Sequence, residues 1–112
     1  MKLLNVAIPS RQFDASVAFY RDIVGLPISR QGMGCCYFSA GNANIAVHVA
    51  REGSDFAPTG HGIYLDLAVT RFEQLKQRLN DAGIAIRKEW NDDSGHFIEV
   101  ADPDGNLIEL VG

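Results

Sequence analysis

The sequence lacks three features that would each place the protein in a definite class. It contains no apolar run near the roughly 20 residues that a membrane-spanning helix needs. Its first residues lack the apolar core and small-residue cleavage site of a secretory signal. It also lacks a basic excess, since the formal net charge is −4. We therefore expect a cytoplasmic protein that binds neither membranes nor nucleic acids.

Cysteine is scarce as well. The chain has two cysteines, Cys35 and Cys36, and they are neighbours. Neighbouring cysteines rarely bridge, because the ring that they would close is strained. We expect two reduced thiols, as in a cytoplasmic protein, and no sequence signal marks an activating partner for a catalytic thiol.

The composition that is present is typical of a globular protein. The 112 residues are 46% hydrophobic and 21% charged, which suits one domain of ordinary size. A chain this short buries only about two-thirds of its unfolded surface, so a second chain would help to complete its core or its site. We expect a single domain over residues 1–112, with a first module at about 1–50, a linker at about 51–61 and a second module at about 62–112.

The first half of the chain predicts a strand, a helix and further strands. Alternation of apolar and polar residues predicts a strand over residues 3–8, ended by Pro9. Asp14 is a candidate cap for a helix that runs to about Val24, and Gly25 suits a left-handed helix end. Two further strands are expected before the linker, at about 35–39 and 44–49.

The same order then repeats in the second half. A strand is expected at 63–69, and Thr70 and Glu73 form a predicted capping box for a helix that ends at Gly83. Three further strands are expected at about 84–89, 97–101 and 107–111. The Asp-Pro-Asp-Gly sequence at 102–105 predicts a tight turn between the last two strands. Because both halves share this order, we expect an internal duplication.

Two segments match known sequence motifs. One is Ser-Val-Ala-Phe-Tyr at 16–20, followed by Gly25, and the other is Asp-Pro-Asp-Gly-Asn-Leu-Ile-Glu-Leu at 102–110. They resemble the first helix and the closing hairpin of the vicinal oxygen chelate superfamily, the group of glyoxalases, bleomycin-binding proteins and ring-cleaving dioxygenases. The resemblance implies an α+β fold of two βαβββ modules that form a half-barrel cup, with the helices on its convex side. It also implies a homodimer, and in some relatives the partner completes the cup.

Alternation along the strands divides their side chains into an aliphatic face and a polar face. The aliphatic face is expected to pack against the two helices. According to the resemblance, the polar face lines the cup and binds a small-molecule ligand. The predicted ligand-binding residues are Asn5, His48, Tyr64, Asp66, Phe97, Glu99 and Glu109.

The resemblance also predicts where a metal would be bound. Metal-using relatives take ligands from the opening and last strands of each module, and the matching positions are Asn5, Ala46, Tyr64 and Glu109. Only Glu109 is a ligand type that the family commonly uses, and neutral tyrosine binds divalent ions poorly. We therefore expect neither a metal nor another cofactor. The alternative, a divalent metal ion held by His48 and Glu109 with a further carboxylate, stays open.

Several other polar residues have two interpretations. We expect Glu99 and Glu109 to face each other across the last hairpin. They form either an acid–base pair that shares a proton or two solvated carboxylates without a catalytic role. Trp90 is expected to end a strand, as a ring at the mouth of the cup or as a rim residue. His61 and His96 are expected to be polar surface residues.

A second resemblance concerns function. The segment Pro9–Asp14 is similar to the same region of bleomycin-resistance proteins, which are acidic, metal-free dimers that hold a flat cationic antibiotic. This favours a protein that sequesters a small cationic or aromatic compound such as an antibiotic. The alternative is a metal-dependent glyoxalase-type lyase or ring-cleaving dioxygenase, with Glu109 as the candidate catalytic residue and His48 as a substitute donor. A dimer whose cup has lost its function is a third hypothesis, so the sequence leaves open whether the protein is an enzyme.

Overall fold

The chain folds as two modules with the same order of elements: a strand, a helix and three strands. The computed structural model describes residues 1–51, 53, 55–59 and 62–112. The first module consists of β1 (Asn5–Ser10), α1 (Phe13–Ala18), the π-helical η1 (Phe19–Val24), β2 (Ile28–Gly32), β3 (Cys35–Ala40) and β4 (Ala43–Val49). The second consists of β5 (Tyr64–Ala68), α2 (Phe72–Asp81), β6 (Lys88–Asp92), β7 (Gly95–Ala101) and β8 (Leu107–Val111). The predicted α+β fold of two βαβββ modules is confirmed.

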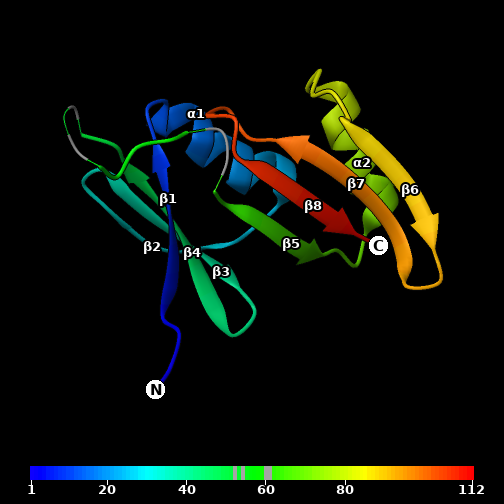
Figure 1. Ribbon diagram of the computed structural model, residues 1–112, viewed down its shortest axis with the longest axis horizontal. Coiled ribbons are helices and arrows are strands. Elements are labelled where there is room, and N and C mark those ends of the chain that lie inside the picture. The colour runs from blue at the N-terminus through cyan, green and yellow to red at the C-terminus, as the bar shows by residue number, and fades with distance from the viewer. Residues whose placement is uncertain (52, 54, 60–61) are drawn as a thin grey trace.

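Each module forms its own four-stranded sheet. The strand orders are β1-β4-β3-β2 and β5-β8-β7-β6, and in both sheets the opening strand pairs in parallel with the last one. This matching topology agrees with the expected duplication. Figure 1 shows the two sheets side by side, and no strand in the described part of the chain pairs with a strand of the other sheet. The sheets therefore form an open arrangement and not a closed barrel.

The apolar core lies on one face of each sheet, against the helices. In β7 and β8 the alternating aliphatic side chains are fully buried, as the alternation predicts: Ile98, Val100, Ile108 and Leu110. Buried residues of both modules form one cluster: Ile8, Val17, Phe19, Tyr20, Cys36, Phe38, Ile45, Val47, Leu75, Leu79, Ile98, Val100, Ile108 and Leu110. The other face of each sheet, which we term its open face, carries the polar residues.

The helices end where the sequence predicts. Gly25 (φ 87°) and Gly83 (φ 70°) both adopt the left-handed conformation that glycine tolerates best. In η1 the hydrogen bonds span five residues, since the N–H of Gly25 bonds the carbonyl of Tyr20 at 3.2 Å. The first helical segment therefore closes with a wider turn than an α-helix has.

The predicted helix caps are wrong. The N-cap of α1 is Gln12, so Asp14 lies inside the first turn. The N-cap of α2 is Arg71, so the Thr70–Glu73 capping box does not form. Neither N-cap residue makes a side-chain capping hydrogen bond. Each predicted capping side chain is displaced by one or two positions, which is enough to turn it away from the free N–H groups.

Three strand predictions also differ from the structure. The strand β1 continues through Pro9 to Ser10, because it is an edge strand whose outer side needs no N–H. The strand β6 covers Lys88–Asp92 instead of 84–89, so Trp90 lies inside a strand and not at its end. The sequence pattern predicts no strand at β2. Both β2 and β6 are edge strands with mostly exposed side chains, so they show no apolar alternation.

The closing turn of the second module docks onto the start of the first module. Asp104, in the predicted turn at 102–105, accepts hydrogen bonds from the Ser10 and Ser16 hydroxyls and from the N–H of Arg11. Burial by itself raises the pKa of Asp104, but these hydrogen bonds outweigh it and hold the pKa below its ordinary value of 3.8. The turn therefore contributes a charged anchor between the modules, a role that its sequence does not reveal.

A second polar contact between the modules is buried. The hydroxyl of Tyr20 donates to Asp102 Oδ2 at 2.7 Å, and Asn106 donates to the same carboxylate. Burial, followed by the charge of Asp102, raises the pKa of Tyr20 far above its ordinary value. Arg78 of α2 adds a hydrogen bond of 2.8 Å to the carbonyl of Ile23. The two modules are therefore joined by specific contacts as well as by the shared core.

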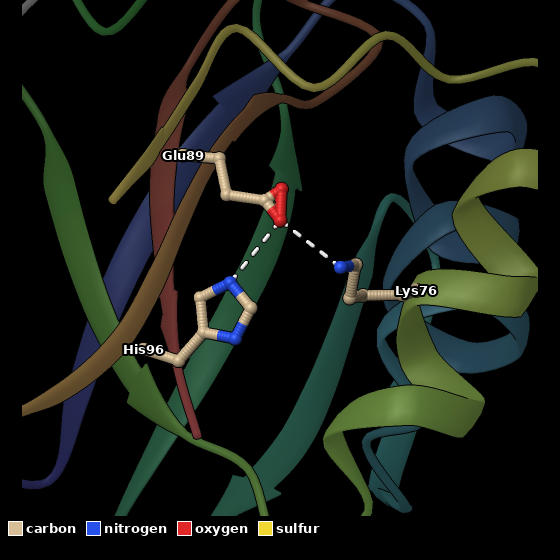
Figure 2. A network of polar contacts seen from close by, with 3 residues as sticks. All are labelled: Lys76, Glu89 and His96. Carbon is tan, nitrogen blue, oxygen red and sulfur yellow. Dashed lines mark hydrogen bonds and ion pairs between the residues drawn. The ribbon is translucent and has the colours of Figure 1, made fainter. Parts of the chain in front are cut away.

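On the second module a small polar network holds the helix against the sheet. Figure 2 shows Glu89 of β6 between Lys76 of α2 and His96 of β7. Glu89 Oε1 lies 3.0 Å from Lys76 Nζ and 3.1 Å from His96 Nε2. The hydrogen bond from Lys76, followed by that from His96, lowers the pKa of Glu89. His96 is thus a partly exposed residue with a structural partner.

None of the described helices is long and apolar enough to cross a membrane.

Candidate functional site

The open face of the second sheet brings three carboxylates into one line. In the strand register Asp66 of β5 is opposite Glu109 of β8, which is opposite Glu99 of β7. Side chains opposite each other on neighbouring strands point to the same face with Cβ atoms about 5 Å apart. We term these three residues the carboxylate row. Glu99 is 5% exposed, so one end of the row is largely shielded from water.

Tyr64 links two members of this row. Its hydroxyl lies 2.9 Å from Glu99 Oε2 and 3.0 Å from Glu109 Oε2, so one proton serves both carboxylates. Partial desolvation, followed by these two hydrogen bonds, raises the pKa of Tyr64 above its ordinary value. Arg87 Nε lies 3.3 Å from Glu99 Oε1 and compensates part of the negative charge. The expected pairing of Glu99 and Glu109 is thus found with a tyrosine bridging them.

An aromatic surface adjoins the carboxylate row. Trp90 of β6 stacks on Phe97 of β7 with ring centroids 5.1 Å apart and planes 4° apart. Phe97 is two residues from Glu99 on the same strand, so both rings lie on the open face of the second sheet. Negative charge next to a flat ring pair is an arrangement that suits a planar cation.

The open face of the first sheet has a different character. His48 of β4 is partly buried, and its Nδ1 lies 2.9 Å from the carbonyl oxygen of Val49. Its ring meets the ring of Phe56 edge-on, with centroids 5.7 Å apart. Asn5 is opposite Asn44 at the other end of the β1–β4 pair. This face therefore presents amide, imidazole and aromatic groups and no carboxylate row.

The structure divides the predicted ligand-binding residues between the two sheets. Tyr64, Glu99 and Glu109 are in contact, and Asp66 and Phe97 share their face. Asn5 and His48 lie on the other sheet. Whether any of them touches a ligand stays a prediction.

Three polar residues that contribute to these faces were not predicted. Tyr37 alternates with buried Cys36 and Phe38, so its position on the open face could have been inferred from β3. Arg30 and Arg87 lie in or beside exposed edge strands, where no pattern marks them.

The residues of this chain do not fit a complete metal site. Within the described residues, no group of three or more His, Cys, Asp or Glu side chains is arranged to hold an ion. The raised pKa keeps Tyr64 protonated, and its hydroxyl already uses a lone pair of Glu99 and of Glu109. The alternative donor His48 lies on the other sheet and does not join the carboxylates within one chain. His61 lies outside the described residues.

Comparison with known proteins agrees with this architecture. The family model of the glyoxalase/bleomycin resistance protein/dioxygenase superfamily matches residues 2–110. The chain belongs to this superfamily. It is 30% identical to the glutathione transferase FosA of Serratia marcescens, over 96% of this chain and 76% of that protein.

Solved structures of other proteins share the fold. A lactoylglutathione lyase from Agrobacterium tumefaciens superposes with a TM-score of 0.76 and 20% identity, covering 97% of this chain and 91% of that one. TnmS3, an antibiotic-binding protein from Streptomyces sp. CB03234, superposes with a TM-score of 0.75 and 20% identity, covering 99% and 94%. At this identity the likeness establishes the fold and leaves the activity undetermined.

Proposed function

We propose that this superfamily member binds a small cationic or aromatic molecule without chemically changing it. The observation that carries the proposal is the carboxylate row beside the stacked rings of Trp90 and Phe97. A carboxylate shielded from bulk water attracts a cation more strongly than an exposed one. A flat cation would stack on the rings while its charge faces Glu109, next to the shielded Glu99.

The fold likeness to an antibiotic-binding protein supports this proposal. TnmS3 shares the arrangement of two modules over nearly the whole of both chains. The incomplete donor set supports it too, because a binding protein needs no metal. A flat antibiotic with a positive charge has the chemistry that this face would recognise.

We further propose that the protein is a cytoplasmic homodimer in which a partner covers the open face of the second sheet. A concave site excludes water better than one exposed sheet face, and ligand sites usually bury most of the ligand. Among the described residues of one chain, no strand pairing joins the first sheet to the sheet that carries the carboxylate row. A second copy, whose first sheet faces this row, would supply the other wall.

Ligand titration tests the proposed binding. Trp90 is the only tryptophan, so its fluorescence reports on this face directly. We expect a planar cation, 1-methylquinolinium, to quench Trp90 and to bind measurably in calorimetry, and uncharged quinoline to bind less tightly. Glu109→Gln should weaken the cation about tenfold, since one partly shielded charge contact is worth about 1.4 kcal/mol.

The control variant is Glu73→Gln, which removes the same charge from the exposed side of α2. It should bind the cation as the unchanged protein does. Equal affinity for quinoline and 1-methylquinolinium, or equal loss in both variants, would show that the carboxylate row does not bind cations.

A metal-dependent enzyme is the second candidate, and the 30% identity to FosA, a glutathione transferase, favours an enzyme. In this case Glu109 of one chain and His48 of its partner would hold a divalent ion between two copies. Metal analysis of protein purified without chelator separates the two candidates. Stoichiometric zinc, nickel, manganese or iron that is lost in Glu109→Ala would replace the binding proposal by the enzyme.

A further inference from the structure

A separate cavity opens on the first sheet. Its volume is about 440 Å³, and all of its lining residues belong to the first module. Its charged lining residues are Lys2 and Arg30, and no acidic side chain lines it in the described part of the chain. The cavity therefore has the opposite charge to the carboxylate row.

Arg30 lies on an aromatic ring and has no acidic partner among the described residues. Its guanidinium carbon lies 4.3 Å from the centroid of the Tyr37 ring. Within the described residues no carboxylate forms an ion pair with it. A guanidinium that lies on an aromatic face keeps its in-plane N–H groups free, and these groups match both oxygens of a carboxylate.

Two amides line the same cavity as this guanidinium. Asn5 and Asn44 line the cavity and are opposite each other in the β1–β4 register. The Ser29 hydroxyl lies 3.3 Å from the Tyr37 carbonyl oxygen and 3.4 Å from Asn44 Oδ1, so its single proton is shared between them, and the NH₂ group of Asn44 is left to donate elsewhere. Amide donors next to Arg30 and Lys2 favour a negatively charged guest.

We propose that this cavity binds the carboxylate of a small planar molecule. Arg30 holds the carboxylate through two parallel hydrogen bonds while it stays on the Tyr37 ring, Asn5 and Asn44 donate to the carboxylate oxygens, and the ring of the guest extends away from Arg30 within the cavity. The site is distinct from the carboxylate row, both in its sheet and in its charge. Within one chain the cavity and the carboxylate row share no residue, although in the proposed dimer this sheet would face the partner's row.

Calorimetry and side-chain amide NMR with benzoate test the site. We expect benzoate to bind, neutral benzamide to bind at least about tenfold more weakly, and shifts in the side-chain amides of Asn5 and Asn44. Arg30→Gln should weaken benzoate about tenfold, and Arg30→Lys should weaken it less, since lysine keeps the charge but loses the paired geometry. Arg51→Gln, which removes an exposed charge outside the cavity, should leave the affinity unchanged.

Three results would overturn the proposal. The first is equal affinity for benzoate and benzamide. The second is an equal loss of benzoate affinity in Arg30→Gln and Arg51→Gln. The third is tighter binding of inorganic phosphate than of benzoate, which would remove the need for a planar guest. Arg30 lies on an edge strand with exposed side chains, so the variants should fold. Glu109→Gln must not weaken benzoate binding, which separates this site from the carboxylate row.

Discussion

Tyr64 shows how one side chain can set the charge of a site. Its hydroxyl is the donor for two carboxylates, so losing its proton would place a third negative charge beside them. The phenol therefore stays protonated in the folded protein at pH values where an unfolded tyrosine, with an ordinary pKa of 10.0, has ionised. Because the pKa is raised in the folded state, the stabilisation from Tyr64 is complete below pH 10 and is lost as the pH rises above it.

This sign leads to a prediction for Tyr64→Phe. The tyrosinate absorbance at 295 nm of the native protein should be the same in this variant and in the unchanged protein between about pH 9 and 11, because native Tyr64 does not ionise there. In urea unfolding at pH 7, the variant should be less stable by about 1 kcal/mol, because a hydroxyl hydrogen bond to a charged group is lost at a half-exposed position. A lower absorbance at 295 nm in the native variant than in the unchanged protein near pH 10 would mean that Tyr64 ionises there. This result would contradict the proposed bridge.

At the residue scale the sequence predicts which face a side chain occupies better than which side chains meet. Alternation places Tyr64, Glu99 and Glu109 on one face, and the structure confirms that they are in contact. It also places Asn5 and His48 on a polar face, which proves to belong to a different sheet. A period of two residues fixes the side of a strand and carries no information about the packing of one sheet against another.

At the scale of elements, the two helix ends offer a matched pair. Both Gly25 and Gly83 have positive φ, so alanine should cost about 1 kcal/mol at either position. At Gly83 a Cβ atom would meet nothing within 4 Å, whereas at Gly25 it would lie 3.2 Å from Arg78 Nη2. Arg78 is bonded to the carbonyl of Ile23, so it has little room to move.

We therefore predict that Gly25→Ala is the more destabilising of the two substitutions. Urea unfolding followed by circular dichroism should give a loss of about 1 kcal/mol for Gly83→Ala and about 2 kcal/mol for Gly25→Ala. An equal loss in both variants would mean that the contact with Arg78 does not contribute.

Strands with one buried face are predictable, and edge strands are not. The boundaries of β8 match the prediction at 107–111, because its alternating side chains are fixed by burial. The strands β2 and β6 are exposed along most of their length, so their sequences show no hydrophobic alternation. These two strands are defined by their hydrogen bonds to β3 and β7. At α1 a tertiary contact is involved as well, since the docked turn of the other module bonds Arg11, just before the helix, and Ser16 within it.

At the scale of the whole molecule, the closing turn joins the modules through Asp104. Its lowered pKa means that its stabilisation is present above pH 3.8 and is lost as the pH falls through the lower folded value. Asp104→Asn replaces one acceptor oxygen by a donor NH₂ group that faces existing donors. We predict a loss of about 1–3 kcal/mol at pH 7 by urea unfolding, shrinking as the pH approaches 3.

The matched control for this prediction is Asp93→Asn, in the exposed turn between β6 and β7. It should change the stability little at any pH. A loss in Asp104→Asn that stays constant down to pH 3 would show that the carboxylate charge does not stabilise the contact between the modules.

The last prediction concerns how two copies complete the binding site. If the first sheet of one chain faces the second sheet of its partner, then His48 and Glu109 around one ligand come from different chains. His48→Ala and Glu109→Gln should then each weaken 1-methylquinolinium binding. In a mixed dimer, one site carries both changes and the other carries neither.

Mixing the two variants after unfolding and refolding them together should thus restore tight binding at about one site in four, because half of the dimers are mixed. Light scattering should show a dimer in every sample. A monomer at all concentrations would exclude the shared site. A dimer without any restored binding would instead mean that each chain builds its site alone, since only residues of different chains can complement each other in this way.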